Sequence, residues 1–396
     1  MSERNQPLSP AAMPARFRDH RIDFWRGLAL VMIFIDHVPG NVFEKLTLRN
    51  FGVSDSAEIF VFLSGFSAAI AYFTKFMGGA PVYASVRVYQ RVGKLYMAHV
   101  VTLVGAIALY FGAAIWLSDA HWTKVNGLDF FIRDPVHAMV GLATLAYQIG
   151  YFNILPLYVV LLAGLPVLMV LARRNLSMAF SASFALYAIA HLGGWALPNV
   201  PEDGAWFFDP FSWQLLFTIG FIAGALYSGR EPVPFNGAVY GLAVLVLVAG
   251  AVIQFGQLWP LEGSLPVPNF LYTFDKATLA LPRMVHALAL IYVVAHLPYG
   301  WIDARIMRSG LANPLSRMGR HSLPVFCFGA LLSVVGQVLE RRTGGTFAAD
   351  AVIIISGLGL QLGLAMWLDL WKAITAPRPA AGRAPAEAAL ARSAGR

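Results

Sequence analysis

The sequence is poor in charge and contains almost no cysteine. Only 13% of its 396 residues are Asp, Glu, Lys or Arg, whereas soluble domains contain roughly 25%. The one cysteine, Cys327, excludes an intrachain disulfide framework. Apolar residues make up 58% of the chain and give a mean hydropathy of +0.63. This composition excludes a soluble globular domain and predicts a membrane protein.

The N-terminal segment also lacks a secretory signal. Residues 1–20 contain no short apolar stretch followed by a small-residue cleavage site, so we interpret them as a polar cytoplasmic leader. Residues 21–376 form the predicted transmembrane domain. Residues 377–396 are rich in Ala, Arg and Pro, and we predict that they form a disordered cytoplasmic tail.

Long apolar stretches recur along the domain, each close to the length of about 20 residues that crosses a bilayer as a helix. We therefore predict an all-α polytopic membrane protein, a bundle of about ten transmembrane helices. The segment 134–147 is too short to span, and we interpret it as an interfacial or re-entrant helix. The predicted spans are about 27–43, 56–77, 95–117, 151–172, 178–197, 211–229, 236–256, 278–298, 318–339 and 350–373.

The distribution of charge predicts the orientation. With the N-terminus inside, most Lys and Arg residues fall on inner segments, and the acidic loops fall outside, as the positive-inside rule requires. Both termini are then cytoplasmic. The net charge of +8 alternates between loops and forms no single stripe, so we assign it to the lipid bilayer and predict no nucleic-acid partner.

Two adjacent ionisable residues, Asp36 and His37, lie inside the first predicted span. Such groups are costly in lipid and are functional candidates by default. An imidazole at this depth can act as a general base toward a hydroxyl. Asp36 can orient it or bond another helix, and the alternative is a structural histidine packed between helices. Pro39 predicts that the helix ends or bends just past the pair.

Three further polar residues lie near the top of this span. Asn41 follows the pair and is a candidate for substrate binding. Glu58 begins the second span from the outer side, and it can support the imidazole or hold the acceptor, unless it is only a helix N-terminal acid favoured by the dipole. Ser64, Gly65 and Ser67 are small and favour close helix packing.

Cationic residues gather at the inner face. Arg87, Arg91 and Lys94 share one helical face, and Arg21 and Arg26 lie at the start of the first span. These cations can hold the phosphates of a nucleotide-bearing donor. The alternative is ordinary positive-inside charge in contact with lipid headgroups.

The eighth span carries Lys276, Arg283 and His286. A buried arginine usually has an anionic partner, here either a protein carboxylate or a carboxylate of the substrate. Outer loops contain aromatic and polar residues, which suit sugar stacking or an interfacial belt. Inner cations, a protonatable pair and aromatic outer loops together describe transfer of a group from a cytoplasmic donor to an outside acceptor.

Five motifs in this order and spacing resemble the OpgC family, whose members are linked to succinylation of periplasmic glucans. Four of them, all except NILPLY, also resemble the wider type-3 integral-membrane acyltransferases. The resemblance runs from about residue 20 to 373. The motifs are RIDFWRGLALVMIFIDHVPGN, SDSAEIFVFLSGF, RVYQRVGKLY, NILPLY and GRHSLPVFCFGA.

The resemblance implies a bacterial inner-membrane O-acyltransferase. Its donor is acyl-CoA, as succinyl-CoA or acetyl-CoA, used as a co-substrate with no tightly bound cofactor and no metal. Its acceptor is a periplasmic glucan. The family's first-helix histidine falls on His37, and its inner basic motif falls on Arg91 and Lys94, with Arg87 nearby. The wider superfamily tends to have a second arginine where this chain has Lys94.

The hypotheses for Asp36 and His37 predict different structures. An acyltransferase needs a tunnel from the inner basic cluster to His37, where the sugar oxygen attacks the thioester directly or through an acyl-enzyme. The second hypothesis is a proton-coupled transporter of a polar solute, with Asp36 and His37 as a proton relay. The third hypothesis is a scaffold or sensor subunit, in which Asp36 and His37 would have no function.

Overall fold

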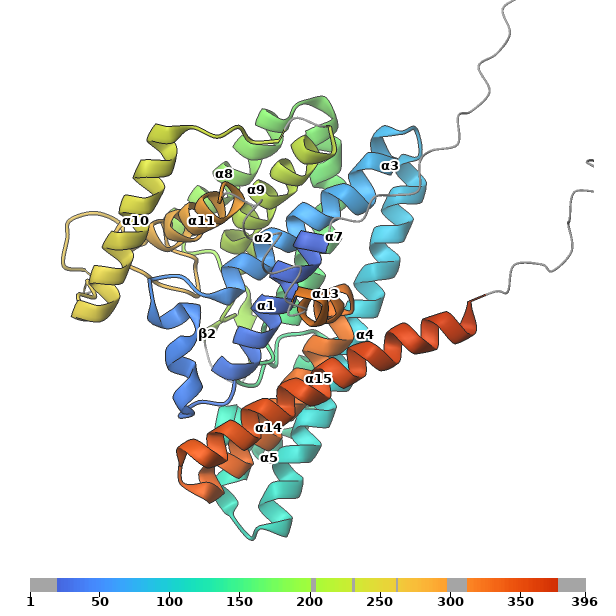
Figure 1. The fold of residues 1–396 in the computed structure, drawn as a ribbon, viewed down its shortest axis with the longest axis vertical. Helices are drawn as coiled ribbons and strands as arrows, with labels where there is room; N and C mark the ends of the chain where they lie inside the picture. Colours follow the sequence, from blue (N-terminus) through green and yellow to red (C-terminus); the bar gives the residue numbers. More distant parts are fainter. Residues whose placement is uncertain (1–19, 201–203, 230–231, 261–262, 298–311, 377–396) are drawn as a thin grey trace, which may run out of the picture.

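The computed structural model describes residues 20–200, 204–229, 232–260, 263–297 and 312–376. The predicted leader, except His20, and the predicted tail lie outside these residues. The described chain is almost entirely helical, as predicted (Figure 1). Its only strands are β1 (Pro198–Asn199) and β2 (Gly204–Ala205), which pair antiparallel.

Each of the ten predicted spans corresponds to a helical segment. Eight helical segments in the described residues are long and apolar enough to cross a membrane, and α1 and α11, with 17 and 15 residues, are shorter. The segments are α1 (His20–Asp36), α2 (Ser56–Ala68) continued by a π-helix (Ala69–Phe73) and α3 (Thr74–Met77), α4 (Pro81–Trp116), α7 (Ile154–Arg174), α8 (Leu176–Gly193), α9 (Pro210–Ser228), α10 (Gly237–Gly256), α11 (Leu281–Ala295), α14 (Ser322–Thr343) and α15 (Phe347–Thr375).

Short helices fill the connections. The predicted interfacial segment contains α6, nine residues long and too short to span, as expected. The short elements are η1 (Val42–Leu46), η2 (Leu48–Asn50), η4 (Ala120–Thr123), η5 (Val125–Gly127), α5 (Leu128–Arg133), α6 (Pro135–Ala143), η6 (Asn269–Leu271) and α13 (Ala312–Arg320).

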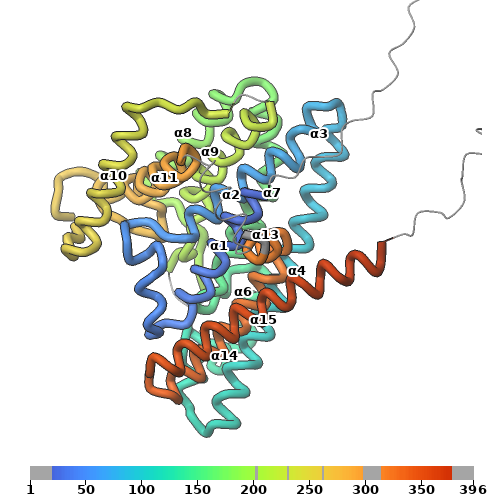
Figure 2. Tube along the Cα trace, in the orientation of Figure 1, coloured from blue at the N-terminus to red at the C-terminus, as the bar shows by residue number. Residues whose placement is uncertain are grey.

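The bundle has a packed centre and less buried flanks. Helices α1, α2, α7, α9 and α14 contribute to the main hydrophobic core. A second cluster joins α4 to α14 and to the short helices that follow α4. Helix α10 packs on α11 at one edge of the molecule and buries little surface (Figure 2). We call the end at which α1, α4 and α14 begin the inner end, and the opposite end the outer end.

Close helix contacts at the centre depend on glycine. A Cβ atom on Gly27 would lie 2.0 Å from the carbonyl oxygen of Leu315, and one on Gly319 would lie 1.8 Å from that of Asp23. Helices α1 and α13 therefore touch through their backbones. In the same way a Cβ on Gly65 would lie 2.0 Å from the carbonyl oxygen of Phe217, so close packing predicted for this position is found against α9.

Two predicted boundaries were wrong. The first helix ends at Asp36, beside the pair as Pro39 predicted, and not near residue 43 as the span estimate had it. The Asn41 amide takes up the carbonyls of Ile35 and Val38, at 2.9 and 2.5 Å. Helix α4 begins at Pro81, fourteen residues before the predicted span at 95. Pro81 suits the first position of a helix, and Arg87, Arg91 and Lys94 are good helix formers whose charge lowers the hydropathy of these turns.

Candidate active site

Two cavities lie along the bundle axis. The outer cavity has a volume of about 660 Å³ and is lined by the end of α1, the segment 49–57, the start of α7 and residues of the outer loops. The inner cavity, about 210 Å³, is lined by α1, α2, α4, α7 and α14. Predicted site residues fall on both cavities, so we describe each in turn.

His37 is half-buried in the wall of the outer cavity. It is the first residue past α1, and its backbone N–H donates to the carbonyl of Ile33 at 3.0 Å. Its ring stacks on Tyr151, with centroids 4.6 Å apart and planes at 27°. Within the described residues no hydrogen bond to the ring is formed, so neither ring nitrogen is held by a protein group.

A chain of hydrogen bonds fixes the His37 backbone. Gln337 on α14 donates from Nε2 to the His37 carbonyl at 2.8 Å. The Tyr110 hydroxyl on α4 donates to Gln337 Oε1 at 2.7 Å, and the Asn126 amide donates to the Tyr110 oxygen at 3.0 Å. Asn126 also lines the outer cavity. Three separate segments therefore hold the end of α1 in place.

Asp36 lines the same cavity, and its observed hydrogen bond is to the loop after α1. Its Oδ1 accepts a hydrogen bond from the Thr47 hydroxyl at 2.6 Å. Among the described residues no hydrogen bond joins Asp36 to the imidazole, in agreement with their different directions on a helix. Asp36 holds the loop after α1, and its predicted role toward the imidazole stays a prediction.

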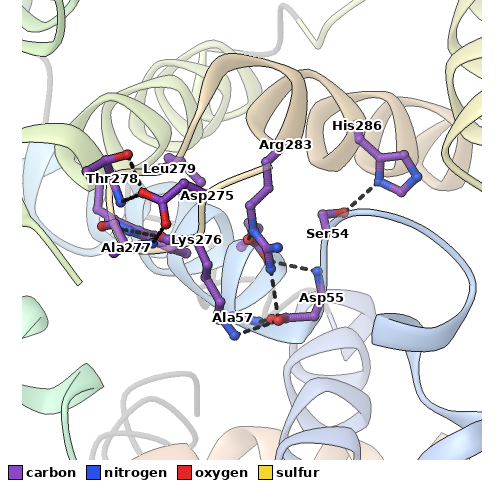
Figure 3. A network of polar contacts seen from close by, with 12 residues as sticks. Ser54, Asp55, Ala57, Asp275, Lys276, Ala277, Thr278, Leu279, Arg283 and His286 are labelled. Carbon is purple, nitrogen blue, oxygen red and sulfur yellow. Dashed lines mark hydrogen bonds and ion pairs between the residues drawn. The ribbon is translucent and has the colours of Figure 1, made fainter. Parts of the chain in front are cut away.

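The carboxylates at the start of α2 are engaged by two cations, as Figure 3 shows for Asp55. Lys276 Nζ and Arg283 Nη2 both donate to Asp55 Oδ2, at 2.5 and 2.9 Å. Arg283 Nε pairs with Glu58, which is fully buried and also accepts the Asp55 backbone N–H at 2.8 Å. The buried arginine thus has protein carboxylates as its partners. The sequence left open whether this partner is a protein carboxylate or a carboxylate of the substrate, and the structure shows protein carboxylates.

The electrostatics of Asp55 follow from this arrangement. Burial alone would raise the pKa of its carboxyl group. The positive charges of Lys276 and Arg283 and the hydrogen bonds that it accepts outweigh burial, and they hold the pKa well below its usual range. Asp55 therefore stays ionised and locks α2 to α11.

Three residues predicted for the outer half of the site line neither cavity. Glu58 does not line the outer cavity, and it is the capping-box acid of α2. His286 bonds the Ser54 hydroxyl through Nδ1 at 2.7 Å, and Asn41 is fully buried as a cap of the loop after α1. Their placement indicates a structural contribution, whereas Lys276 and Arg283 do line the outer cavity.

The inner cavity collects two of the predicted cations. Arg26 and Arg91 lie in its wall, together with hydroxyl side chains. Arg21, Arg87 and Lys94 do not line it, and Arg87 and Lys94 are exposed on α4. Ser64 and Ser67, predicted only as packing residues, also face this space. The hydroxyl-bearing lining residues are Ser64, Ser67, Tyr72, Tyr158 and Ser322.

The expected tunnel is not continuous. The two cavities meet at Phe326 of α14, which among the described residues is the one that lines both. Its ring is buried and lies parallel to that of Phe60, with centroids 6.4 Å apart. Inner cations and His37 are therefore brought to neighbouring chambers and not to a single open channel.

Sequence reasoning missed the residues that shape the outer cavity. Tyr151 and Gln337 come from segments distant along the chain, and nothing local to His37 points to them. Phe326 lies inside the motif GRHSLPVFCFGA and Tyr151 lies two residues before NILPLY, so those motifs were the available signal. Their contacts became visible only with the fold.

Comparison with known proteins gives one family. The model described as OpgC protein matches residues 18–373, nearly the whole chain. No curated protein and no solved structure matches the chain.

Proposed function

The chain belongs to the OpgC family, and from this premise we propose that it is a membrane O-acyltransferase that moves an acyl group from acyl-CoA to a hydroxyl of a glycan. One observation carries the proposal. The helix that ends at His37 in the outer cavity passes Arg26 in the inner cavity, so α1 links a cationic chamber to an imidazole. The charge bias of the loops puts the inner end in the cytoplasm.

The inner cavity suits the donor. Arg26 and Arg91 present guanidinium groups, which match phosphate oxygens in charge and geometry. Exposed Arg87 and Lys94 on α4, with Arg21 on α1, extend this charge toward the aqueous face. We assign the nucleotide phosphates to this region and the pantetheine arm to the hydroxyl-lined cavity.

The outer cavity suits a sugar. Tyr151, Phe207, Phe208 and Trp259 provide ring faces in its wall, and Asn153 and Asp36 provide polar groups. Aromatic rings with a few convergent polar groups are typical of small-molecule sites. The acceptor is then a periplasmic glucan and the acyl group is succinyl, as the family description implies for an inner-membrane enzyme.

The reaction assigns one chemical role to His37. Its imidazole removes the proton of a sugar hydroxyl, and the oxygen attacks the thioester carbonyl. The new C–O ester bond forms, the C–S bond breaks, and the imidazolium returns the proton to the departing CoA thiolate. Tyr151 holds the ring by stacking, and Gln337 fixes the backbone that carries it.

Reconstituted vesicles test this function. Labelled succinyl-CoA is supplied at the inner end and a β-glucan at the outer end, and we expect labelled glucan ester and free CoA in equal amounts. Solute uptake without any covalent product would support the proton-coupled transporter and contradict the proposal. Omitting either substrate is the matched control, and both omissions abolish ester formation.

A further inference from the structure

The partition between the two cavities is thin. On α7, Ile154 lines the outer cavity and the next residue, Leu155, lines the inner one. On α2, Ala57 lines the outer cavity and Phe60 the inner one, a separation of three residues or roughly 4.5 Å along the helix. About one helical turn therefore separates the chambers.

Three aromatic rings make up most of this layer. Phe326 is parallel to Phe60, and Phe60 meets Tyr158 edge to face, with centroids 5.7 Å apart. All three side chains are almost fully buried. Among the described residues Phe326 alone lines both cavities, so rotation of its side chain about its torsions is the smallest movement that would join them.

The helix that carries Phe326 is pinned at its start. Residue His321 stands between α13 and α14, and its Nε2 bonds Asp369 Oδ1 at 2.8 Å. Packing of α14 against α4 and α15 adds to this restraint. Opening the partition is therefore a side-chain movement at Phe326 and not a displacement of α14.

We propose that Phe326, closed against Phe60, is the partition that separates thioester from outer water, and that it sets the preference for a sugar hydroxyl over water as acceptor. This inference rests on the proposed acyl transfer. With the ring in place, the thioester in the inner cavity is kept apart from the imidazole of His37 and from the water of the outer cavity. When the ring swings aside, the thioester reaches His37 and the bound sugar fills the outer cavity.

Loss of the ring opens a second reaction. Water then reaches the thioester, its oxygen forms the new C–O bond, and the C–S bond breaks. The products are the free carboxylic acid and CoA thiol, with the proton of water ending on the thiolate or in solvent. Hydrolysis without acceptor is thus the chemical signature of a missing partition.

The kinetic test compares Phe326→Ala with the parent protein. We expect a several-fold rise in the ratio of free acid to glucan ester. The matched control is Phe62→Ala, also a buried phenylalanine, which lines neither cavity and leaves the ratio unchanged. If Phe326→Ala folds poorly, Phe326→Leu provides the same comparison with less loss of volume. An unchanged ratio in the folded variants would overturn the inference.

A second measurement does not depend on turnover. Ser64→Cys introduces a thiol into the inner cavity, in a background in which Cys327→Ser removes the native one. A small charged methanethiosulfonate reagent applied at the outer face leaves this thiol unmodified in the parent and modifies it when Phe326→Ala is added. The same reagent from the inner face modifies both proteins.

Equal labelling from the outer face in both proteins would contradict the partition. Labelling that changes as expected in a protein that makes no glucan ester would preserve the partition and reject the proposed function. Thiol labelling therefore tests the partition, and formation of glucan ester tests the proposed function.

Discussion

At the scale of single residues, the site depends on what holds His37. Its ring has one stacking partner and no hydrogen bond among the described residues, while its backbone is fixed from another helix. Among the described residues no carboxylate bonds the His37 ring, and the hydrogen bond of Asp36 is to Thr47. Orientation by Tyr151 and Gln337 takes the place of a carboxylate.

The Tyr151 ring is expected to matter more than its hydroxyl. Stacked aromatic pairs contribute about 0.5–1.5 kcal/mol beyond burial, so Tyr151→Leu should lower kcat by roughly 2- to 10-fold. Tyr151→Phe keeps the ring and should stay near the parent rate. Steady-state formation of glucan ester measures both, and equal loss in the two variants would argue against stacking.

Gln337 is a positioning residue whose removal should act on turnover. Gln337→Leu leaves the His37 carbonyl and the Tyr110 hydroxyl without their partner. A displacement of about 1 Å at a reacting group can lower the rate by up to about 100-fold, so kcat should fall while KM for acyl-CoA stays constant.

The matched control for Gln337 lies on the neighbouring helix. Gln361 of α15 is buried, whereas Gln337 is half-buried, and Gln361 lines neither cavity. Gln361→Leu should reduce stability to a similar degree and leave kcat unchanged. If kcat fell equally in both variants, general destabilisation would explain the loss in Gln337→Leu, and positioning of His37 would not.

At the scale of elements, α2 and α11 are joined by a buried ionic cluster made of Asp55, Glu58, Lys276 and Arg283. The sequence predicted Glu58, Lys276 and Arg283 as candidate site groups, but it predicted neither Asp55 nor the pairing of the four residues. Pairing between residues more than 220 positions apart requires the fold, because local pattern carries no register between distant helices. Span positions, by contrast, depend on local hydropathy and were predicted well.

Breaking this cluster from one side should be costly. Arg283→Met leaves Glu58 buried without its cation, and removal of one partner of a buried pair costs about 3–5 kcal/mol. The double variant Arg283→Met with Glu58→Gln removes the uncompensated charge and should regain much of the loss. Thermal unfolding in detergent measures both, and a double variant less stable than the single one would contradict this pairing.

The Asp55 carboxylate should make stability depend on pH. Its pKa is lowered by Lys276 and Arg283, so its stabilising contribution is complete above the ordinary carboxyl range and is lost as pH falls through the lowered value. Asp55→Asn should therefore be less stable than the parent at neutral pH. The gap in melting temperature should narrow as pH falls below about 4. A gap that is constant with pH would exclude this origin.

At the scale of the whole molecule, the sequence predicted an all-α bundle with ten helical segments, and the structure contains them. It also placed cations at one end of α1 and an imidazole at the other. No pattern in the sequence indicated that the interior is divided into two cavities. Gln337 contacts His37 from 300 positions away, and cavities arise from such packing and not from any periodicity in the chain.

The most direct test of the account is ester formation by the His37→Ala protein in oriented vesicles that contain succinyl-CoA at the inner end and glucan at the outer end. The control is His137→Ala, an exposed histidine in α6 that pairs only with Asp134 among the described residues. We predict that ester formation is abolished in the first variant and unchanged in the second, with both proteins inserted and folded. Glucan ester formed at the parent rate by the His37→Ala protein would contradict the account.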